Sequence, residues 1–334
     1  MQGGSILVAG GAGYIGSHAA LALREQGHQV LVVDDLSEGH RDAVLDAELV
    51  EGSLLDGDFL AGVFRDHDVA AVMHFAAHCY VGESVTHPGR YYRNNVVGTL
   101  NLLTAMVAAG VDFLVFSSTC ATYGEPTRMP ITEDEAQQPV NPYGESKLWC
   151  ERLIRDFGGA HGIRGVALRY FNAAGADPGG RLGEDHHPET HLIPLVLGAL
   201  AGKGPVLTVF GDDYPTADGT CVRDYVHVTD LAAAHVLALQ AVPRLAPGLT
   251  AYNLGNERGT SVMEVIRAAE AVCGGKVQYR VGPRRPGDPP TLVGSSRKIQ
   301  TELSWEPRLG TIESIVETAW KWHRDHPEGY GARA

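Results

Sequence analysis

The stretch SILVAGGAGYIGSHAALALREQGHQVLVVDDLS, residues 5–37, decides the fold class. It opens with a short apolar run at 6–9, continues through a glycine cluster into a helical pattern of apolar residues, and reaches Gly27, where a helix would end. A second apolar run at 30–33 follows and ends in two aspartates. A strand, a loop, a helix and a second strand over this length predict two parallel strands joined by a right-handed crossover.

The same alternation continues through the first half of the chain. Apolar runs predict strands at 48–51, 70–74, 113–117 and 164–169, and helical patterns separate them at 57–65, 88–109 and 142–161. Such strands between amphipathic helices predict an α/β fold with a doubly wound parallel sheet of the Rossmann type. Past about residue 172 the pattern is less regular, with helices expected near 192–202, 229–240, 261–272 and 311–323. We expect a first domain at 1–172 and a smaller α/β substrate lobe at 173–334, some of whose segments return to the first domain.

The composition limits the kinds of partner and the cellular location that we expect for this protein. A net charge of −13 over 334 residues argues against nucleic acid or an anionic membrane surface as the main partner. Five dispersed cysteines without a C-x-x-C pair are typical of reduced thiols in a cytoplasm. The first apolar run contains too many glycines for a signal peptide or a membrane span. We therefore expect a cytoplasmic protein.

The residues 10–16, GGAGYIG, follow the first strand and open the helix, which is the context of a dinucleotide-binding loop. Gly10 permits the tight turn, Gly13 lets the backbone approach a pyrophosphate, and Gly16 lets the helix pack against the strand. The helix N-terminus offers free N–H groups to that anion. Asp34 ends the second strand, where it would bind a ribose diol and repel a 2′-phosphate, so we expect NAD rather than NADP.

The stretch NPYGESKLWCE, residues 141–151, places a tyrosine and a lysine on one face of a predicted helix. Pro142 suits the first helical turn, and Tyr143 and Lys147 are then four residues apart. Alone, this spacing is equally compatible with a tyrosine that packs on a lysine stem. Together with the glycine loop, it resembles the extended short-chain dehydrogenase/reductase family.

That resemblance implies that Tyr143 is the general acid/base in the oxidation of an alcohol or the reduction of a ketone. Free tyrosine has a pKa of ~10, so a base near neutral pH needs this value lowered by about three units, or roughly 4 kcal/mol. We expect Lys147 and the positive nicotinamide ring to lower it. By the same resemblance Thr119, in the hydroxyl cluster that ends the strand at 113–117, relays the proton.

Longer segments narrow the resemblance to the UDP-glucose 4-epimerases within that family. In chain order they are VAGGAGYIGSH, HFAAHCYVGESV, YYRNNVVGTLNLL, FSSTCATYGEP, NPYGESK, LRYFNAAGAD, VFGDDYPTADGTCVRDYVHVTDLA and YNLGN. The resemblance implies that NAD takes hydride from C4 of a UDP-hexose while Tyr143 takes the O4 proton, and that hydride returns to the opposite face of a 4-keto sugar. It also implies a role in galactose metabolism and a homodimer formed through helices such as 88–109 and 142–161.

Carried over by position, the resemblance assigns residues to two ligands. For NAD they are Gly10, Gly13, Tyr14, Ile15, Gly16, Asp34, Asp35, Leu36, Ser53, Leu54, Phe75, Ala76, Ala77, Asn94, Ser117, Tyr143, Lys147 and Tyr170. For the UDP-sugar they are Thr119, Tyr143, Asn172, His191, Leu192, Phe210, Arg223, Arg285, Asp288 and Leu292. Planar guanidinium groups suit phosphate oxygens, so the two arginines are expected to clamp the diphosphate.

Four positions depart from the best-known bacterial pattern. Cys79 replaces a lysine that contacts the cofactor phosphates, Ser53 replaces an acid that meets the adenine, and His191 replaces an asparagine that contacts substrate. Leu292 occupies the position that gates the sugar pocket. In the family a large aromatic there excludes N-acetylated sugars and a small residue admits them. Leucine is intermediate in size, so acceptance of UDP-N-acetylhexosamines stays open.

The stretch DHHPETH, residues 185–191, suggests a metal site because His187 and His191 are four residues apart. Pro188 between them argues against a helix that carries both, and no typical metal motif accompanies them. We therefore expect no metal, and we interpret these histidines as loop residues near a substrate phosphate.

Some alternative functions need residues that this chain lacks, and others are not excluded by the sequence. A 4,6-dehydratase needs an Asp-Glu pair after the threonine, where this chain has Cys120 and Ala121. A silent NAD-binding regulator would have no need of the three catalytic residues, and a simple reductase would release its cofactor at each turnover. A 4-epimerase of pentose or uronate nucleotides uses identical chemistry and is not separated by the sequence.

Overall fold

Seven parallel strands form the central sheet of the computed structural model, which describes residues 3–285 and 288–331. Their order is β10-β6-β5-β4-β1-β2-β3. The bounds are β1 Ser5–Ala9, β2 Val30–Asp34, β3 Glu48–Glu51, β4 Val69–His74, β5 Phe113–Thr119, β6 Arg164–Tyr170 and β10 Gly248–Leu254. The order runs outward in both directions from β1, which confirms the doubly wound sheet expected from the sequence and places its switch point beside the glycine loop.

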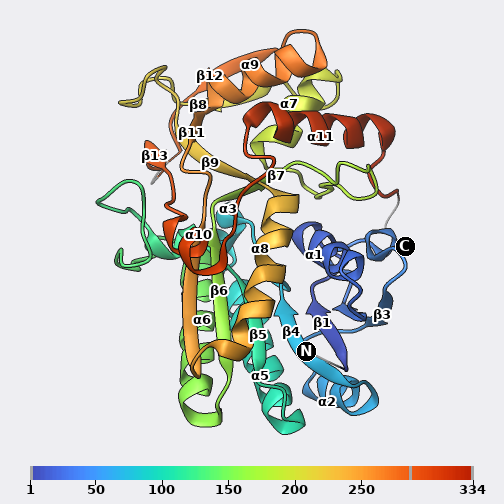
Figure 1. Cartoon of the computed structure of the whole chain (residues 1–334). Coiled ribbons are helices and arrows are strands. Elements are labelled where there is room, and N and C mark those ends of the chain that lie inside the picture. Colours follow the sequence, from blue (N-terminus) through green and yellow to red (C-terminus); the bar gives the residue numbers. More distant parts are fainter. Residues whose placement is uncertain (1–2, 286–287, 332–334) are drawn as a thin grey trace.

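Helices cover both faces of this sheet. On one face α1, Tyr14–Glu25, and α8, Val228–Ala241, pack against apolar side chains of the strands, such as Val8, Val32 and Val166. In Figure 1 α8 crosses in front of the sheet. On the other face lie α2, Gly57–Asp66, α5, Gly98–Ala109, and α6, Pro142–His161, with Leu7, Leu31 and Leu114 beneath them. Alternate residues of the same strands thus enter two separate cores, which explains why the strands are apolar throughout.

The second lobe lies above the carboxyl ends of the strands in Figure 1. Its strands are β7 Asn172–Ala174, β8 Leu207–Phe210, β9 Val222–His227, β11 Gly259–Ser261, β12 Tyr279–Gly282 and β13 Thr291–Leu292. Its helices α7 Leu192–Leu200, α9 Val262–Cys273 and α11 Ile312–Asp325 share a third apolar core. Shorter elements are η1 Arg41–Val44, α3 Val81–Thr86, η3 Cys120–Tyr123, η4 Val242–Arg244 and α10 Arg297–Leu303.

Two elements from the second half of the chain belong to the first sheet. Strand β10 pairs in parallel with β6 over its whole length, and α8 packs against α1. The stretch 88–109 is helical throughout but changes its hydrogen-bonding pattern twice, from α4 Pro88–Tyr91 through the π-helix η2 Tyr92–Val97 to α5. In the part of the chain that the structure describes, no helix is both long and apolar enough to cross a membrane.

A buried ion pair fastens α6 to the sheet. The guanidinium of Arg169 on β6 donates to both carboxylate oxygens of Glu151 on α6, at 2.9 and 2.6 Å, and the two side chains are almost fully buried. Ser118 of β5 and Gln137 also donate to Glu151, and Arg169 donates to the hydroxyl of Tyr123 at 2.8 Å. Burial by itself would raise the pKa of Glu151, but these hydrogen bonds, led by that of Arg169, hold it below its ordinary value.

We expect Glu151→Ala to lower the free energy of unfolding by about 3–5 kcal/mol, because it leaves the charge of Arg169 buried without a partner. Urea denaturation followed by circular dichroism measures this loss. The control Arg65→Ala removes the arginine of an exposed pair with Asp66 and should leave the midpoint unchanged. Equal midpoints for the two variants would contradict the assignment. Because the pKa of Glu151 is lowered by folding, the stabilisation is present above the ordinary glutamate value of ~4.3 and disappears as pH falls through the folded value.

Candidate functional site

The glycine loop between β1 and α1 leaves room for a ligand's phosphates. Gly10 has φ of +78°, and a Cβ there would lie 2.4 Å from the backbone nitrogen of Ala76. A Cβ on Gly16 would lie 2.1 Å from the carbonyl oxygen of Gly10, whereas one on Gly13 would meet nothing closer than 3.5 Å. Within the described residues no side chain caps α1, and its first turn holds no acid. The uncapped helix end therefore fits an anion, as the dinucleotide motif requires.

Asp34 lies at the carboxyl end of β2 and is buried. Its two oxygens accept hydrogen bonds from the backbone nitrogens of Ala12 at 3.0 Å and Leu36 at 2.9 Å. Burial raises the pKa of Asp34, and these two N–H groups oppose the shift. The contacts hold the carboxylate at the edge of the glycine loop, where the sequence motif places a ribose.

The other residues assigned to NAD lie around the same edge of the sheet. Phe75 and Ala76 follow β4 and donate backbone hydrogen bonds to Ala9 of β1, at 2.7 and 3.0 Å, and Ala77 is the next residue of that loop. Asp35 accepts a hydrogen bond from the backbone of Ser37, and Leu36 has a positive φ of 56°. The remaining members are Ser53 and Leu54 in the loop after β3, and Asn94 in η2.

The three catalytic candidates meet at the end of β5. Thr119 is the last residue of that strand and is buried, and its hydroxyl accepts from the backbone nitrogen of Ala121 at 3.1 Å. Tyr143 stands in the first turn of α6, which Asn141 caps by accepting from Gly144 at 2.9 Å. The hydroxyl of Thr119 acts on the pKa of Tyr143, which it lowers against the effect of burial. Lys147, one turn further, is buried and donates to the carbonyl oxygen of Ser117 at 2.8 Å.

The acidity of Tyr143 differs from the value expected from the sequence. Burial raises the pKa of Tyr143 well above its ordinary value, with the charges of Cys79 and Tyr170 acting in the same direction, and only the hydrogen bond of Thr119 opposing them. Lys147 is turned toward β5, and burial lowers its own pKa. In the protein without a ligand, burial therefore favours the neutral phenol of Tyr143.

Ser117 and Tyr170 extend this group toward the neighbouring strand. Their hydroxyls are hydrogen-bonded to each other, and both residues are buried at the ends of β5 and β6.

Asn95, which follows the expected Asn94, donates to the hydroxyl of Ser146 at 3.0 Å and to the carbonyl oxygen of His78 at 3.1 Å. Asn94 itself donates to Asn95 at 3.1 Å. Helix α6 and the loop after β4 are thus joined beside Tyr143.

The residues assigned to the nucleotide gather in the second lobe. Arg223 on β9 forms an ion pair with Asp288, and the guanidinium of Arg285 lies over the ring of Phe210, 4.2 Å from its centroid. Strand β12, which leads to Arg285, pairs with β8, which ends at Phe210. The pairing explains how residues distant in sequence come to share one surface.

Three further substrate candidates line the approach to this surface. Asn172 opens β7 and donates its side-chain amide to the backbone of Asp224 at 3.0 Å. Leu192 is the first residue of α7, next to His191 at its N-cap. Leu292 packs with Cys120 against a small cluster of Tyr123, Ile131 and Phe171. Because Cys120 follows Thr119 directly, Leu292 lies near the catalytic end of β5.

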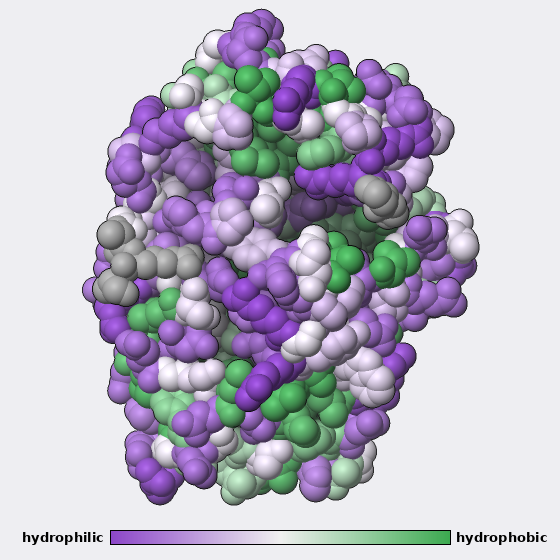
Figure 2. All heavy atoms as spheres, turned by 180° about the vertical axis from the view of Figure 1, so that it is seen from behind, coloured by the Kyte–Doolittle hydropathy of each residue, from purple (hydrophilic) through white to green (hydrophobic). Residues whose placement is uncertain are grey.

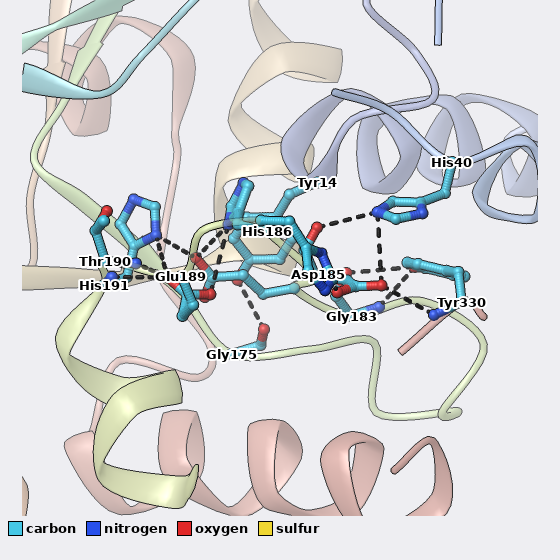
Figure 3. A network of polar contacts seen from close by, with 12 residues as sticks. Tyr14, His40, Gly175, Gly183, Asp185, His186, Glu189, Thr190, His191 and Tyr330 are labelled. Carbon is cyan, nitrogen blue, oxygen red and sulfur yellow. Dashed lines mark hydrogen bonds and ion pairs between the residues drawn. The ribbon is translucent and has the colours of Figure 1, made fainter. Parts of the chain in front are cut away.

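The loop before α7 forms a polar network that the sequence analysis did not foresee (Figure 3). His191 pairs with Glu189 at 2.8 Å and with Glu184 at 3.1 Å, and His186, not His187, is its partner histidine in the network. His187 is largely exposed and pairs with Asp185 at 3.5 Å. The dense run of acids and histidines was the signal for this network. The segment is a loop, as expected from Pro188, and within it His186 and not His187 lies with His191.

Other members of Figure 3 tie this loop to the rest of the molecule. The backbone oxygen of Asp185 lies 3.1 Å from Nε2 of His40, and its carboxylate accepts from the backbone of Tyr330 at 2.9 Å. The hydroxyl of Tyr14 donates to the carbonyl oxygen of Gly175 at 2.7 Å. These contacts link the glycine loop, the second lobe and the C-terminal segment, and no periodic pattern in the sequence could have predicted them.

Comparisons with known proteins agree with this arrangement. Residues 6–255 match the model of the NAD dependent epimerase/dehydratase family. A UDP-glucose 4-epimerase of Halalkalibacterium halodurans is 51% identical over 326 residues, which cover 98% of this chain and 97% of that protein.

Two solved structures are similar over nearly the whole chain. The UDP-glucose 4-epimerase of Brucella ovis in complex with NAD is 49% identical, with a TM-score of 0.93 and coverage of 95% of this chain and 98% of that one. The enzyme of Bifidobacterium longum in complex with NAD⁺ and UDP is 38% identical, with a TM-score of 0.92 and coverage of 97% and 99%. The chain therefore belongs to the NAD dependent epimerase/dehydratase family and, within it, to the UDP-glucose 4-epimerases.

Proposed function

We propose that this chain interconverts UDP-glucose and UDP-galactose by NAD-dependent inversion of the sugar C4. The observation that carries the proposal is the meeting of Thr119, Tyr143 and Lys147 at the carboxyl end of β5. This end of the strand shares its edge of the sheet with the glycine loop after β1. A proton-transfer group and a dinucleotide loop at one edge of a doubly wound sheet support the oxidation of an alcohol.

The cofactor would be held by the glycine loop, Asp34 and the residues that follow β4. Bound NAD would supply the acceptor that takes hydride from C4 and returns it. The positive ring would also bring the charge that the buried Tyr143 lacks, since opposite charge nearby favours the phenolate. We infer from this that Tyr143 becomes a competent base only in the loaded protein.

Some residues of the chain then transfer the proton, and others bind the nucleotide. Tyr143 takes the O4 proton and later returns it, and the hydroxyl of Thr119 orients the reacting oxygen. Arg223 and Arg285 hold the diphosphate, while Asp288 and Phe210 lie beside them for the ribose and the base. A firm hold on the nucleotide combined with weak contacts to the sugar lets the 4-keto sugar present either face.

We also propose the assembly and setting of the molecule. Residues 1–172 act as the cofactor domain and 173–334 as the nucleotide-sugar lobe, with α8 and β10 returning to the first sheet.

All five cysteines, which lie within the described residues, are free thiols, and this supports a cytoplasmic location. Exposed apolar side chains gather on the face shown in Figure 2, and on η2, α5 and α6 they are Tyr92, Val97, Leu100 and Trp149. We propose that they form the interface of a homodimer.

Tyr143→Phe should lower the conversion of UDP-galactose by roughly 10²–10⁴-fold, because it removes the proton acceptor. Chromatography of the sugar nucleotides measures the rate, and NAD released on denaturation measures cofactor retention. The control Tyr279→Phe changes an exposed tyrosine of β12 and should keep full activity. Unchanged turnover in Tyr143→Phe would refute the mechanism, and loss of activity together with loss of NAD would point to a folding defect.

We expect measurable epimerisation of UDP-GlcNAc, because Leu292 is smaller than the aromatic residue that closes this pocket in related enzymes. Leu292→Tyr should reduce that rate roughly tenfold or more while UDP-galactose conversion changes little. Steady-state rates on both substrates give the ratio. A background rate on UDP-GlcNAc in the unaltered protein would end this extension and leave the main proposal intact.

Leu100→Glu should shift the protein from dimer to monomer, because a charge buried in an apolar interface has no partner there. Light scattering after size-exclusion chromatography gives the mass. Val206→Glu, a change at an exposed apolar residue in the second lobe, is the matched control and should leave the mass unchanged. A monomeric unaltered protein would contradict the interface.

A further inference from the structure

Four side chains in the loop before α7 converge on one point. The atoms that Glu184, His186, Glu189 and His191 can offer to a cation all lie within 4.8 Å of one another. Nδ1 of His191 lies 2.8 Å from Glu189 and 3.1 Å from Glu184, and Nδ1 of His186 lies 3.3 Å from Glu184 and 3.7 Å from Glu189. Each imidazole thus faces the same two carboxylates, as Figure 3 shows for Glu189.

The four side chains are close enough together for one cation to reach all of them after small side-chain rotations. Zinc is bound by histidine nitrogen and carboxylate oxygen at about 2.0–2.2 Å, which puts neighbouring ligand atoms about 3.4 Å apart. The four nitrogen–oxygen contacts span 2.8–3.7 Å, with His191 facing Oε1 and His186 facing Oε2 of Glu189, and one ligand atom from each residue lies within 4.8 Å of the others. Two carboxylates also balance the charge of a divalent cation, so the filled site would be neutral inside the protein.

His186 supplies a second observation. Its Nδ1 is buried and has no hydrogen-bond partner among the described residues, and it lies 3.3 Å from Glu184 and 3.7 Å from Glu189. The ring is enclosed by Tyr14 and Tyr80, each with its centroid 6.1 Å away in an edge-to-face arrangement. A cation between this nitrogen and the two carboxylates would satisfy a buried polar atom that otherwise has no partner.

The loop is also held in place as a ligand loop has to be. Asp185 is fixed by His40 and Tyr330, and Gly183 donates to the hydroxyl of Tyr330 at 3.0 Å. His191 is the N-cap of α7, so its position is set by the helix that follows. The start of the loop is therefore anchored by contacts outside the four side chains, and its end continues directly into α7.

We propose that Glu184, His186, Glu189 and His191 form a tetrahedral site for a divalent transition cation, with Zn²⁺ as the chemically preferred occupant. Four protein ligands fill the coordination shell, so the site is structural and not catalytic. It would fasten the loop between Tyr14 at the start of α1 and the first turn of α7. His191 coordinates through Nδ1, which leaves Nε2 for the substrate contact assigned to this residue. The site does not depend on the proposed epimerase activity, because its readout is metal binding.

The test uses the NAD-loaded protein, treated with chelator and then titrated with Co²⁺. Tetrahedral cobalt gives strong visible absorption bands, whereas octahedral cobalt in solvent gives weak ones. We expect these bands to form at one equivalent, to be displaced by Zn²⁺, and to be absent in His186→Asn and in Glu189→Gln. Zinc should raise the Tm of the unaltered protein and not that of either variant.

The matched control is His187→Asn, a change at the exposed neighbouring histidine, which should keep the bands and the zinc-dependent rise in Tm. Cys79→Ser excludes capture of the metal by the exposed thiol, which would add thiolate charge-transfer absorption in the near ultraviolet. Absence of the bands in the unaltered protein overturns the proposal. Persistence of the bands in both ligand variants, or equal loss in His187→Asn, overturns the ligand assignment. Circular dichroism establishes that each variant is folded.

Discussion

The bidentate bond between Arg169 and Glu151 is the constraint on which the catalytic geometry depends. Glu151, Lys147 and Tyr143 follow one another at intervals of four residues, so they lie along one face of α6. Glu151 is bound by β6 and β5, and Lys147 is bound by the backbone of β5 one turn earlier. With two successive turns fixed to the sheet, the third turn can hold Tyr143 only beside Thr119. The charged pair is buried, but it is enclosed by enough hydrogen bonds to offset the cost of desolvation.

The buried position of Tyr143 also affects its acidity. A phenol in a buried setting is a weaker acid than in water, and Lys147, whose charge burial also disfavours, is directed at a carbonyl oxygen. The protein by itself therefore keeps its base protonated. The same arrangement explains why cofactor and catalytic tyrosine share one edge of the sheet.

Much of the first domain could be predicted from the sequence because its signals are local. Continuous apolar runs, the glycine loop and the cap of α6 each act within a few residues, and each element appears where the pattern places it. The contacts of Lys147 and the partners of Glu151 join distant segments, so no periodicity reports them. The histidine loop shows the limit most clearly. Spacing alone paired His187 with His191, while the turn of the chain at this loop places His186 there instead. The roles of individual residues toward the ligands stay predictions.

Strand β10 and helix α8 complete a sheet whose other strands all lie within the first 170 residues. Until residues 228–254 have left the ribosome, the edge of β6 has no neighbour and the apolar side chains beneath α8 face water. The nascent cofactor domain therefore waits for residues 171–254, about a quarter of the 334-residue chain, before its core can close. During that interval the unpaired side of β6 is a strand edge of the kind that can pair with another chain.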